Sequence, residues 1–113
     1  MPKILFADPD KNLTEFLKPF LKSKGFDSIS TTSGNEFLQV VADVNPDVVI
    51  IDLDLKNPSA IETLKEIKGN ERLKTIPVIL TSKGDQRELV RKAINEGADD
   101  YLMKPFFLDL LCA

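Results

Sequence analysis

The sequence contains no histidine and only one cysteine. Without histidine the chain cannot itself supply a Ser-His-Asp triad, a Cys-His pair or a histidine-based zinc site. The lone Cys112 cannot form an intrachain disulfide, which suits a reducing compartment and predicts a cytoplasmic protein. No apolar run approaches the roughly 18 residues that a membrane span needs, and no signal peptide precedes the first apolar segment. We therefore expect no membrane partner.

A strong positive charge is also missing. Acidic residues outnumber basic residues by 18 to 15, whereas a nucleic-acid-binding surface normally needs a clustered positive patch. We therefore expect that this domain does not itself bind nucleic acid. The length of 113 residues fits one domain, over residues 1–113. A domain of this size can bury a core without disulfides or metal ions.

Short apolar runs alternate with amphipathic segments along the whole chain. The runs predict strands over residues 4–7, 27–31, 48–52, 76–80 and 101–103. Four consecutive β-branched residues at 48–51 are typical of a central parallel strand that is covered on both faces. The pattern predicts an α/β fold with a doubly wound, five-stranded parallel sheet. Its last helix, over residues 106–113, would be cut short.

Spaced polar pairs predict where the helices between these strands begin. Each pair has the spacing of a capping box or N-cap: Asn12 with Glu15, Ser33 with Glu36, Ser59 with Glu62, and Asp85 with Glu88. One apolar face is expected on the first helix, made of Leu13, Phe16, Leu17, Phe20 and Leu21.

Polar residues follow four of the five predicted strands. They are Asp8, Asp10, Asp52, Asp54, Thr81, Ser82 and Lys104. Ligands of open parallel sheets bind outside the carboxyl ends of the strands, so these side chains should gather at one site. Each alone has an ordinary explanation as a turn or surface residue, and Asp10 could instead help to cap the first helix. Their joint placement favours a carboxylate site for Mg²⁺, at which an aspartate accepts a phosphoryl group beside a lysine and a hydroxyl.

The sequence resembles the receiver domain of two-component response regulators, a CheY-like family. The resemblance covers essentially the whole chain and rests on four segments: Lys3 to Asp8, Pro46 to Asp52, Ile76 to Ser82, and Gly97 to Phe106. The last segment is the most specific, because Gly-Ala-Asp-Asp-Tyr and Lys-Pro-Phe stand at the spacing of the family.

The resemblance implies a role for each residue of the site. Asp52 would accept a phosphoryl group from the phosphohistidine of a histidine kinase or phosphotransfer protein, and Lys104 would contact that group. Mg²⁺ would be held by Asp8, Asp52 and the backbone carbonyl of Asp54, with Asp10 as an additional candidate. Ser82 would be the switch hydroxyl and Tyr101 the aromatic that changes rotamer with it.

The alignment with the family leaves a choice between two adjacent hydroxyls. Counting without a gap from Lys104 or from Pro77 reaches Ser82, although Thr81 looks superficially like the usual motif. The resemblance also implies a signalling domain that is no enzyme beyond its own phosphorylation and dephosphorylation. Its fourth helix, fifth strand and fifth helix would form the face for an output domain or a homodimer.

One departure from the family weakens this assignment. Pro9 stands where the family usually has a second acidic metal ligand, and proline offers neither a side-chain oxygen nor an N–H. The alternative is a pseudo-receiver, the same fold acting as a docking module without phosphorylation. A nucleotide-binding enzyme is a third reading, but it would need glycines after the first strand, and Asp8-Pro9-Asp10-Lys11 has none.

Overall fold

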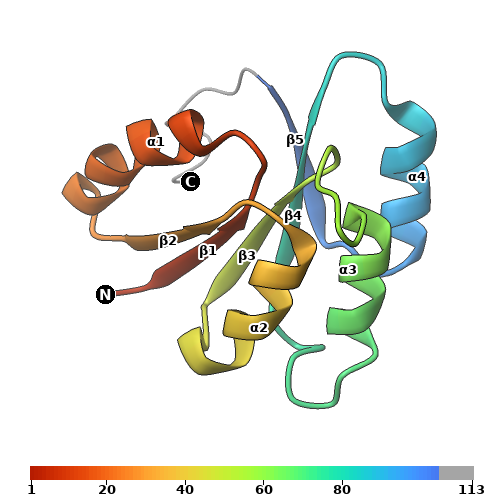
Figure 1. Cartoon of the computed structure of the whole chain (residues 1–113), viewed down its shortest axis with the longest axis horizontal. Helices are drawn as coiled ribbons and strands as arrows, with labels where there is room; N and C mark the ends of the chain where they lie inside the picture. The colour runs from red at the N-terminus through yellow and green to blue at the C-terminus, as the bar shows by residue number, and fades with distance from the viewer. Residues whose placement is uncertain (105–113) are drawn as a thin grey trace.

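The computed structural model describes residues 1–104, so the predicted helix over residues 106–113 lies outside the described part. Five strands alternate with four helices in this range (Figure 1). The strands are β1 (Lys3–Ala7), β2 (Asp27–Thr31), β3 (Val48–Asp52), β4 (Val78–Lys83) and β5 (Asp100–Lys104). The helices are α1 (Lys11–Ser23), α2 (Gly34–Val44), α3 (Ala60–Lys68) and α4 (Arg87–Asn95).

All strand pairs are parallel, and the strands are arranged in the order β2-β1-β3-β4-β5. The order reverses between β1 and β3, where a parallel sheet opens a crevice at the carboxyl ends of its strands. The predicted doubly wound α/β fold is therefore confirmed. Among residues 1–104, no helix is long and apolar enough to cross a membrane.

Alternating side chains divide the sheet into two buried faces. One face packs against α2, α3 and α4, which contribute Phe37, Val41, Leu64, Ile67 and Ala93. The opposite face packs against α1 through Leu17 and Leu21. Figure 1 shows α2 and α3 side by side in front of the sheet, with α1 set apart from them. Because β3 is central and covered on both faces, its last residue, Asp52, is delivered to a buried position.

Two predicted helix starts and one predicted strand were wrong in detail. The first helix is capped by Asp10, whose side chain accepts a hydrogen bond from the Leu13 N–H, and not by Asn12. The fourth helix has Gln86 at its N-cap with no side-chain cap bond, so Asp85 does not cap it. The boxes at Ser33 and Ser59 are confirmed.

The fourth strand covers Val78–Lys83 and not residues 76–80. It extends through the polar Thr81 and Ser82 because β5 pairs with it as far as Lys83. Tertiary pairing therefore overrides local composition here.

Phe16, predicted on the apolar face of the first helix, is 69% exposed.

The loop after β3 is fastened to the beginning of α2. The Gly34 N–H donates to the Lys56 carbonyl over 2.9 Å, and the Asn35 N–H donates to the Asn57 carbonyl. These two carbonyls satisfy donors that a helix N-terminus otherwise leaves unpaired. A Cβ at position 34 would lie 2.5 Å from the Pro58 carbonyl oxygen, so only glycine fits beneath this loop.

We expect Gly34→Ala to lower the free energy of unfolding by about 2 kcal/mol, because the added methyl group must displace backbone atoms of Pro58. Urea denaturation measures this loss. The matched control is Asn35→Ala, which changes an exposed side chain of the same turn and should cost about 0.5 kcal/mol or less. Equal effects of the two substitutions would contradict the tight packing at Gly34.

Candidate functional site

The carboxyl ends of the strands bring the predicted polar residues together. Asp8 follows β1, Asp52 ends β3, and Lys104 ends β5. Alternation places Asp8 and Asp52 on the same face of the sheet as Phe6 and Ile50, the face that α1 covers. Asp8 is 3% exposed and Asp52 is 2% exposed. Two buried carboxylates in adjacent strands need a cation between them.

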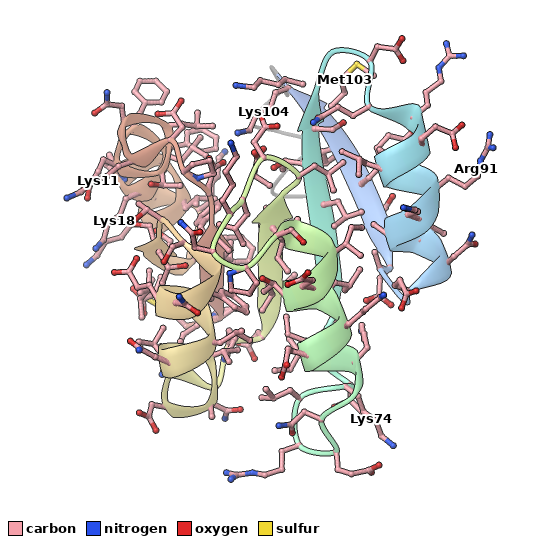
Figure 2. The ribbon with its side chains drawn as sticks, turned by 45° about the vertical axis from the view of Figure 1, so that its right-hand side comes forward. Lys11, Lys18, Lys74, Arg91, Met103 and Lys104 are labelled. Carbon is pink, nitrogen blue, oxygen red and sulfur yellow. The ribbon has the colours of Figure 1, made fainter. Side chains whose placement is uncertain are left out.

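Lys104 supplies that cation. Its Nζ lies 2.7 Å from Asp8 Oδ2 and 2.9 Å from Asp52 Oδ1, and its own side chain is only 13% exposed. Figure 2 shows Lys104 at the same end of the sheet as Met103, near the end of β5. One ammonium thus joins three strands that are far apart in sequence. It holds the two carboxylates together at the crevice.

Burial and this ion pair act on the pKa values of the cluster in different directions. Burial raises the pKa of the Asp8 carboxyl above its usual range, and the hydrogen bond from Lys104 opposes that rise. Burial lowers the pKa of Lys104, but the hydrogen bonds to Asp8 and Asp52 outweigh burial and leave that pKa raised. The lysine therefore stays charged throughout the neutral range.

The Asp52 carboxylate is held by three donors. Oδ1 accepts from Lys104 Nζ and from the Thr81 hydroxyl, the latter over 2.8 Å. Oδ2 accepts from the backbone N–H of Asp54 over 3.0 Å. The sheet register explains the Thr81 contact, because Asp52 pairs directly with Thr81 across β3 and β4. The carboxylate is thus fixed in orientation before any reaction.

Ser82, the predicted switch hydroxyl, lies on the other side of β4. Strand alternation turns it away from Thr81, and it lines a hollow with Tyr101 and Met103 beside α4. Ser82 is 2% exposed, whereas Tyr101 is 45% exposed. The two predicted switch residues, Ser82 and Tyr101, therefore line the same hollow. The hydroxyl that contacts Asp52 belongs to Thr81 instead.

The residues near Asp52 fit a magnesium ion with few protein ligands. Mg²⁺ commonly takes one or two carboxylates and keeps several waters, and Asp8 and Asp52 provide two carboxylates. Asp10 is engaged elsewhere: its N–H donates to Asp8 Oδ1 and its carboxylate caps α1. Within residues 1–104 no group of three or more acidic, histidine or cysteine side chains is placed to hold a metal. The carbonyl of Asp54 is the remaining oxygen of the predicted set.

The sequence analysis missed two residues that join the loops around the site. Lys83 Nζ lies 3.4 Å from Asp54 Oδ2. The Gln86 amide donates to Asp54 Oδ1 over 3.1 Å, and its carbonyl accepts from the Lys83 N–H over 3.0 Å. The sequence pattern indicated only a helix cap at Asp85 with Glu88, so it gave no sign of this bridge between the loops after β3 and β4.

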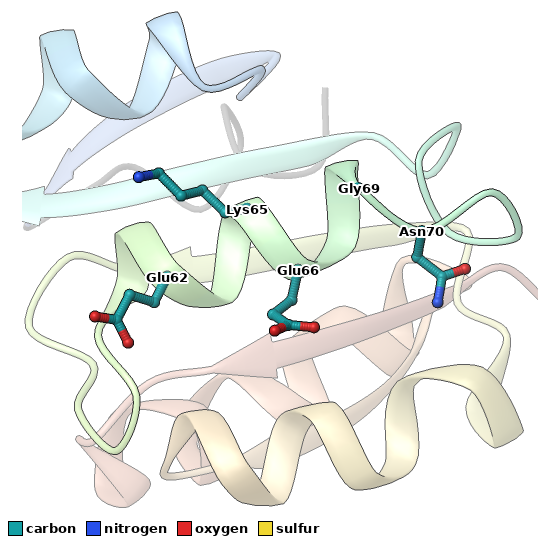
Figure 3. Close-up of a pocket in the computed structure, with 5 residues that line it drawn as sticks. All are labelled: Glu62, Lys65, Glu66, Gly69 and Asn70. Atoms are coloured by element: carbon teal, nitrogen blue, oxygen red, sulfur yellow. The ribbon is translucent and has the colours of Figure 1, made fainter.

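A separate hollow of about 550 Å³ lies on the outer side of α3 (Figure 3). Its lining contains none of the predicted site residues. It consists of Glu62, Lys65, Glu66, Gly69 and Asn70. Charges of both signs on an exposed helix are ordinary, so this hollow adds nothing to the chemistry of the strand ends.

Comparison with known proteins identifies the family of this chain. The model of the response regulator receiver domain matches residues 4–113. The chain is 34% identical over 109 residues to the regulatory protein AtoC of Escherichia coli, covering 96% of this chain and 23% of that protein. It is 35% identical over 105 residues to the DNA-binding response regulator MtrA of Mycobacterium tuberculosis, covering 92% of this chain and 44% of that protein. The chain therefore spans less than half the length of either relative.

Solved structures show the same fold. The receiver domain of the Francisella response regulator 1452 is 34% identical, with a TM-score of 0.86 and coverage of 99% of this chain and 91% of that one. The chemotaxis response regulator CheY4 of Vibrio cholerae shares the fold, with a TM-score of 0.89 at 22% identity over 98% of this chain and 92% of that one. The family model and these relatives define the class of the chain, a signalling domain with a doubly wound α/β fold. The chain belongs to the family of response regulator receiver domains.

We expect Lys104→Met to lower the free energy of unfolding by about 3 kcal/mol at pH 7, because two buried carboxylates lose their cation. The pKa of Asp8 is already raised by burial and will rise further without Lys104. A carboxyl group whose pKa is higher in the folded protein than in the unfolded protein contributes stability at pH values below the unfolded-state pKa. That stability is lost as the pH rises through the folded-state pKa. The loss should therefore shrink as the pH is lowered toward 4, in urea denaturation at each pH.

Lys83→Met is the matched control for this substitution. Its ion pair with Asp54 is exposed, with 70% of the Lys83 side chain accessible, so its loss should cost less than about 1 kcal/mol. A Lys104→Met loss that is the same at both pH values would contradict a central role for the buried carboxylates.

Proposed function

We propose that Asp52 accepts a phosphoryl group from the phosphohistidine of a histidine kinase or phosphotransfer protein. A carboxylate oxygen of Asp52 forms the new bond to phosphorus as the phosphorus–nitrogen bond breaks, and the imidazole departs with that electron pair. The observation that carries the proposal is the fixed, buried carboxylate of Asp52 with Lys104 beside it. Lys104 is then available to pair with the oxygens of the phosphoryl group.

Asp8, Asp52 and the backbone carbonyl of Asp54 would hold the magnesium ion, and Asp10 could join only by leaving its cap on α1. When bound, Mg²⁺ would neutralise negative charge on the transferring phosphoryl oxygens. The chain's own contribution is to orient Asp52 through the Asp54 N–H and to keep the charged Lys104 within reach of the new group.

The proposal includes a conformational switch and the partners that bind the switched surface. Ser82 would move toward the phosphoryl group, and Tyr101 would follow into the hollow that both line. The surface of α4 and β5 would then bind an output domain or a second copy of the chain; the predicted fifth helix, also expected to take part, lies outside the described residues. We further propose that residues 1–113 act as one receiver domain, in the cytoplasm, and that this domain does not itself bind nucleic acid.

A pseudo-receiver is the second candidate, and Pro9 is the observation that favours it. Pro9 gives the site no side-chain oxygen, and the adjacent Asp10 carboxylate is engaged at the helix terminus. In that case the same fold would dock a partner without phosphorylation.

Intact mass spectrometry tests the first candidate directly. Incubation with acetyl phosphate or phosphoramidate and Mg²⁺ should add one phosphoryl group to the protein. Asp52→Asn should remain unmodified, because an amide is not a competent nucleophile here. The asparagine keeps an acceptor for Thr81 and removes one buried charge, so the variant should stay folded. No mass gain at high Mg²⁺ would favour the pseudo-receiver.

Pro9→Asp tests the ligand deficit at this position. A third carboxylate should lower the Mg²⁺ concentration needed for half-maximal thermal stabilisation by roughly tenfold. Pro9→Ala, which changes the backbone but adds no oxygen, is the control and should respond like the parent protein. If both variants respond alike, the proline limits the site through loop shape and not through a missing ligand.

A further inference from the structure

The Thr81 hydroxyl contacts Asp52, the proposed phosphoryl acceptor, and none of the roles assigned above uses this hydroxyl. Its Oγ1 donates to Asp52 Oδ1 over 2.8 Å, and the two residues are 1% and 2% exposed. The two residues are direct partners in the register of β3 and β4. The contact is therefore built into the sheet and does not depend on a loop.

We propose that the Thr81 hydroxyl shortens the lifetime of the aspartyl phosphate on Asp52. This inference rests on the proposed function. In hydrolysis, the bond from phosphorus to the Asp52 oxygen breaks while a water oxygen bonds to phosphorus. The electron pair returns to the carboxylate, the water proton goes to solvent, and inorganic phosphate is released. Asp52 is the leaving group of this reaction.

A hydrogen-bond donor stabilises a carboxylate more strongly than the uncharged carbonyl oxygen of an acyl phosphate. The Thr81 hydroxyl therefore stabilises the leaving group as its charge returns, and this lowers the barrier to hydrolysis. Removing the hydroxyl should leave the carboxylate a poorer leaving group and the phosphorylated state longer-lived.

Formation of the phosphoryl bond should respond much less than its hydrolysis. The transition state of phosphoryl transfer is loose in most analyses, with little bonding to the nucleophile and much charge on the leaving group. In formation Asp52 is the nucleophile, whereas in hydrolysis it is the leaving group. The predicted asymmetry between the two rates is a signature that a merely structural role of Thr81 would not produce.

The surroundings of Asp52 make Thr81→Val a clean test. Valine keeps the branched shape in a buried strand position. Asp52 Oδ1 still accepts from Lys104 Nζ at 2.9 Å, and Oδ2 still accepts from the Asp54 N–H. No oxygen of the carboxylate is left without a donor. Thr81→Ser is the matched control, because it keeps the hydroxyl and loses one methyl group.

The experiment phosphorylates the full chain with acetyl phosphate, removes the donor, and follows the loss of the phosphoryl group by intact mass. We expect the phosphorylated Thr81→Val protein to last about fivefold longer than the parent, with its rate of formation changed by less than about twofold. Thr81→Ser should return the lifetime to within about twofold of the parent. If Thr81→Val is unfolded by circular dichroism, Thr81→Cys replaces it as a weak donor of similar size.

The outcomes distinguish failure of the proposed function from failure of the inference about Thr81. A parent protein that takes up no phosphoryl group overturns the proposed function and this inference with it. A parent that is phosphorylated, with equal lifetimes in the parent and Thr81→Val, overturns the inference alone. Equal changes in the valine and serine variants also overturn it, because they would attribute the effect to packing and not to the hydroxyl.

Discussion

The site depends on one ammonium group between two buried carboxylates. Lys104 lies at the end of β5, and it reaches Asp8 after β1 and Asp52 at the end of β3. Neither carboxylate could stay ionised and nearly fully buried without such a partner. The ion pair therefore ties the last described strand to the middle of the sheet.

The rest of the site holds Asp52 still. Thr81 and the Asp54 N–H fix the two oxygens of its carboxylate. The loop that carries Asp54 is in turn fastened to α2 through the carbonyls of Lys56 and Asn57, and its Pro58 leaves room only for glycine at position 34. Lys83 and Gln86 connect this loop to the one after β4. These contacts connect Asp52 to Gln86, the residue at the N-cap of α4.

Much of the fold could be predicted because its signals are local. The β-branched run at 48–51 and the serine caps at Ser33 and Ser59 were enough to place β3, α2 and α3. The extension of β4 to Lys83 could not be predicted, because it arises from pairing with a strand about 20 residues further on. The bridge from Gln86 to Asp54 was hidden for the same reason, since it joins residues 32 positions apart.

The sequence by itself determined which chemical groups reach the ends of the strands, since strand periodicity and the motif around Lys104 suffice for that. Only the tertiary structure decided which of them touch. It brought the Thr81 hydroxyl to Asp52 and turned Ser82 toward Tyr101, because side chains alternate across a strand whose register is set by its neighbours. Register and burial are properties of the assembled sheet, and no single segment contains them.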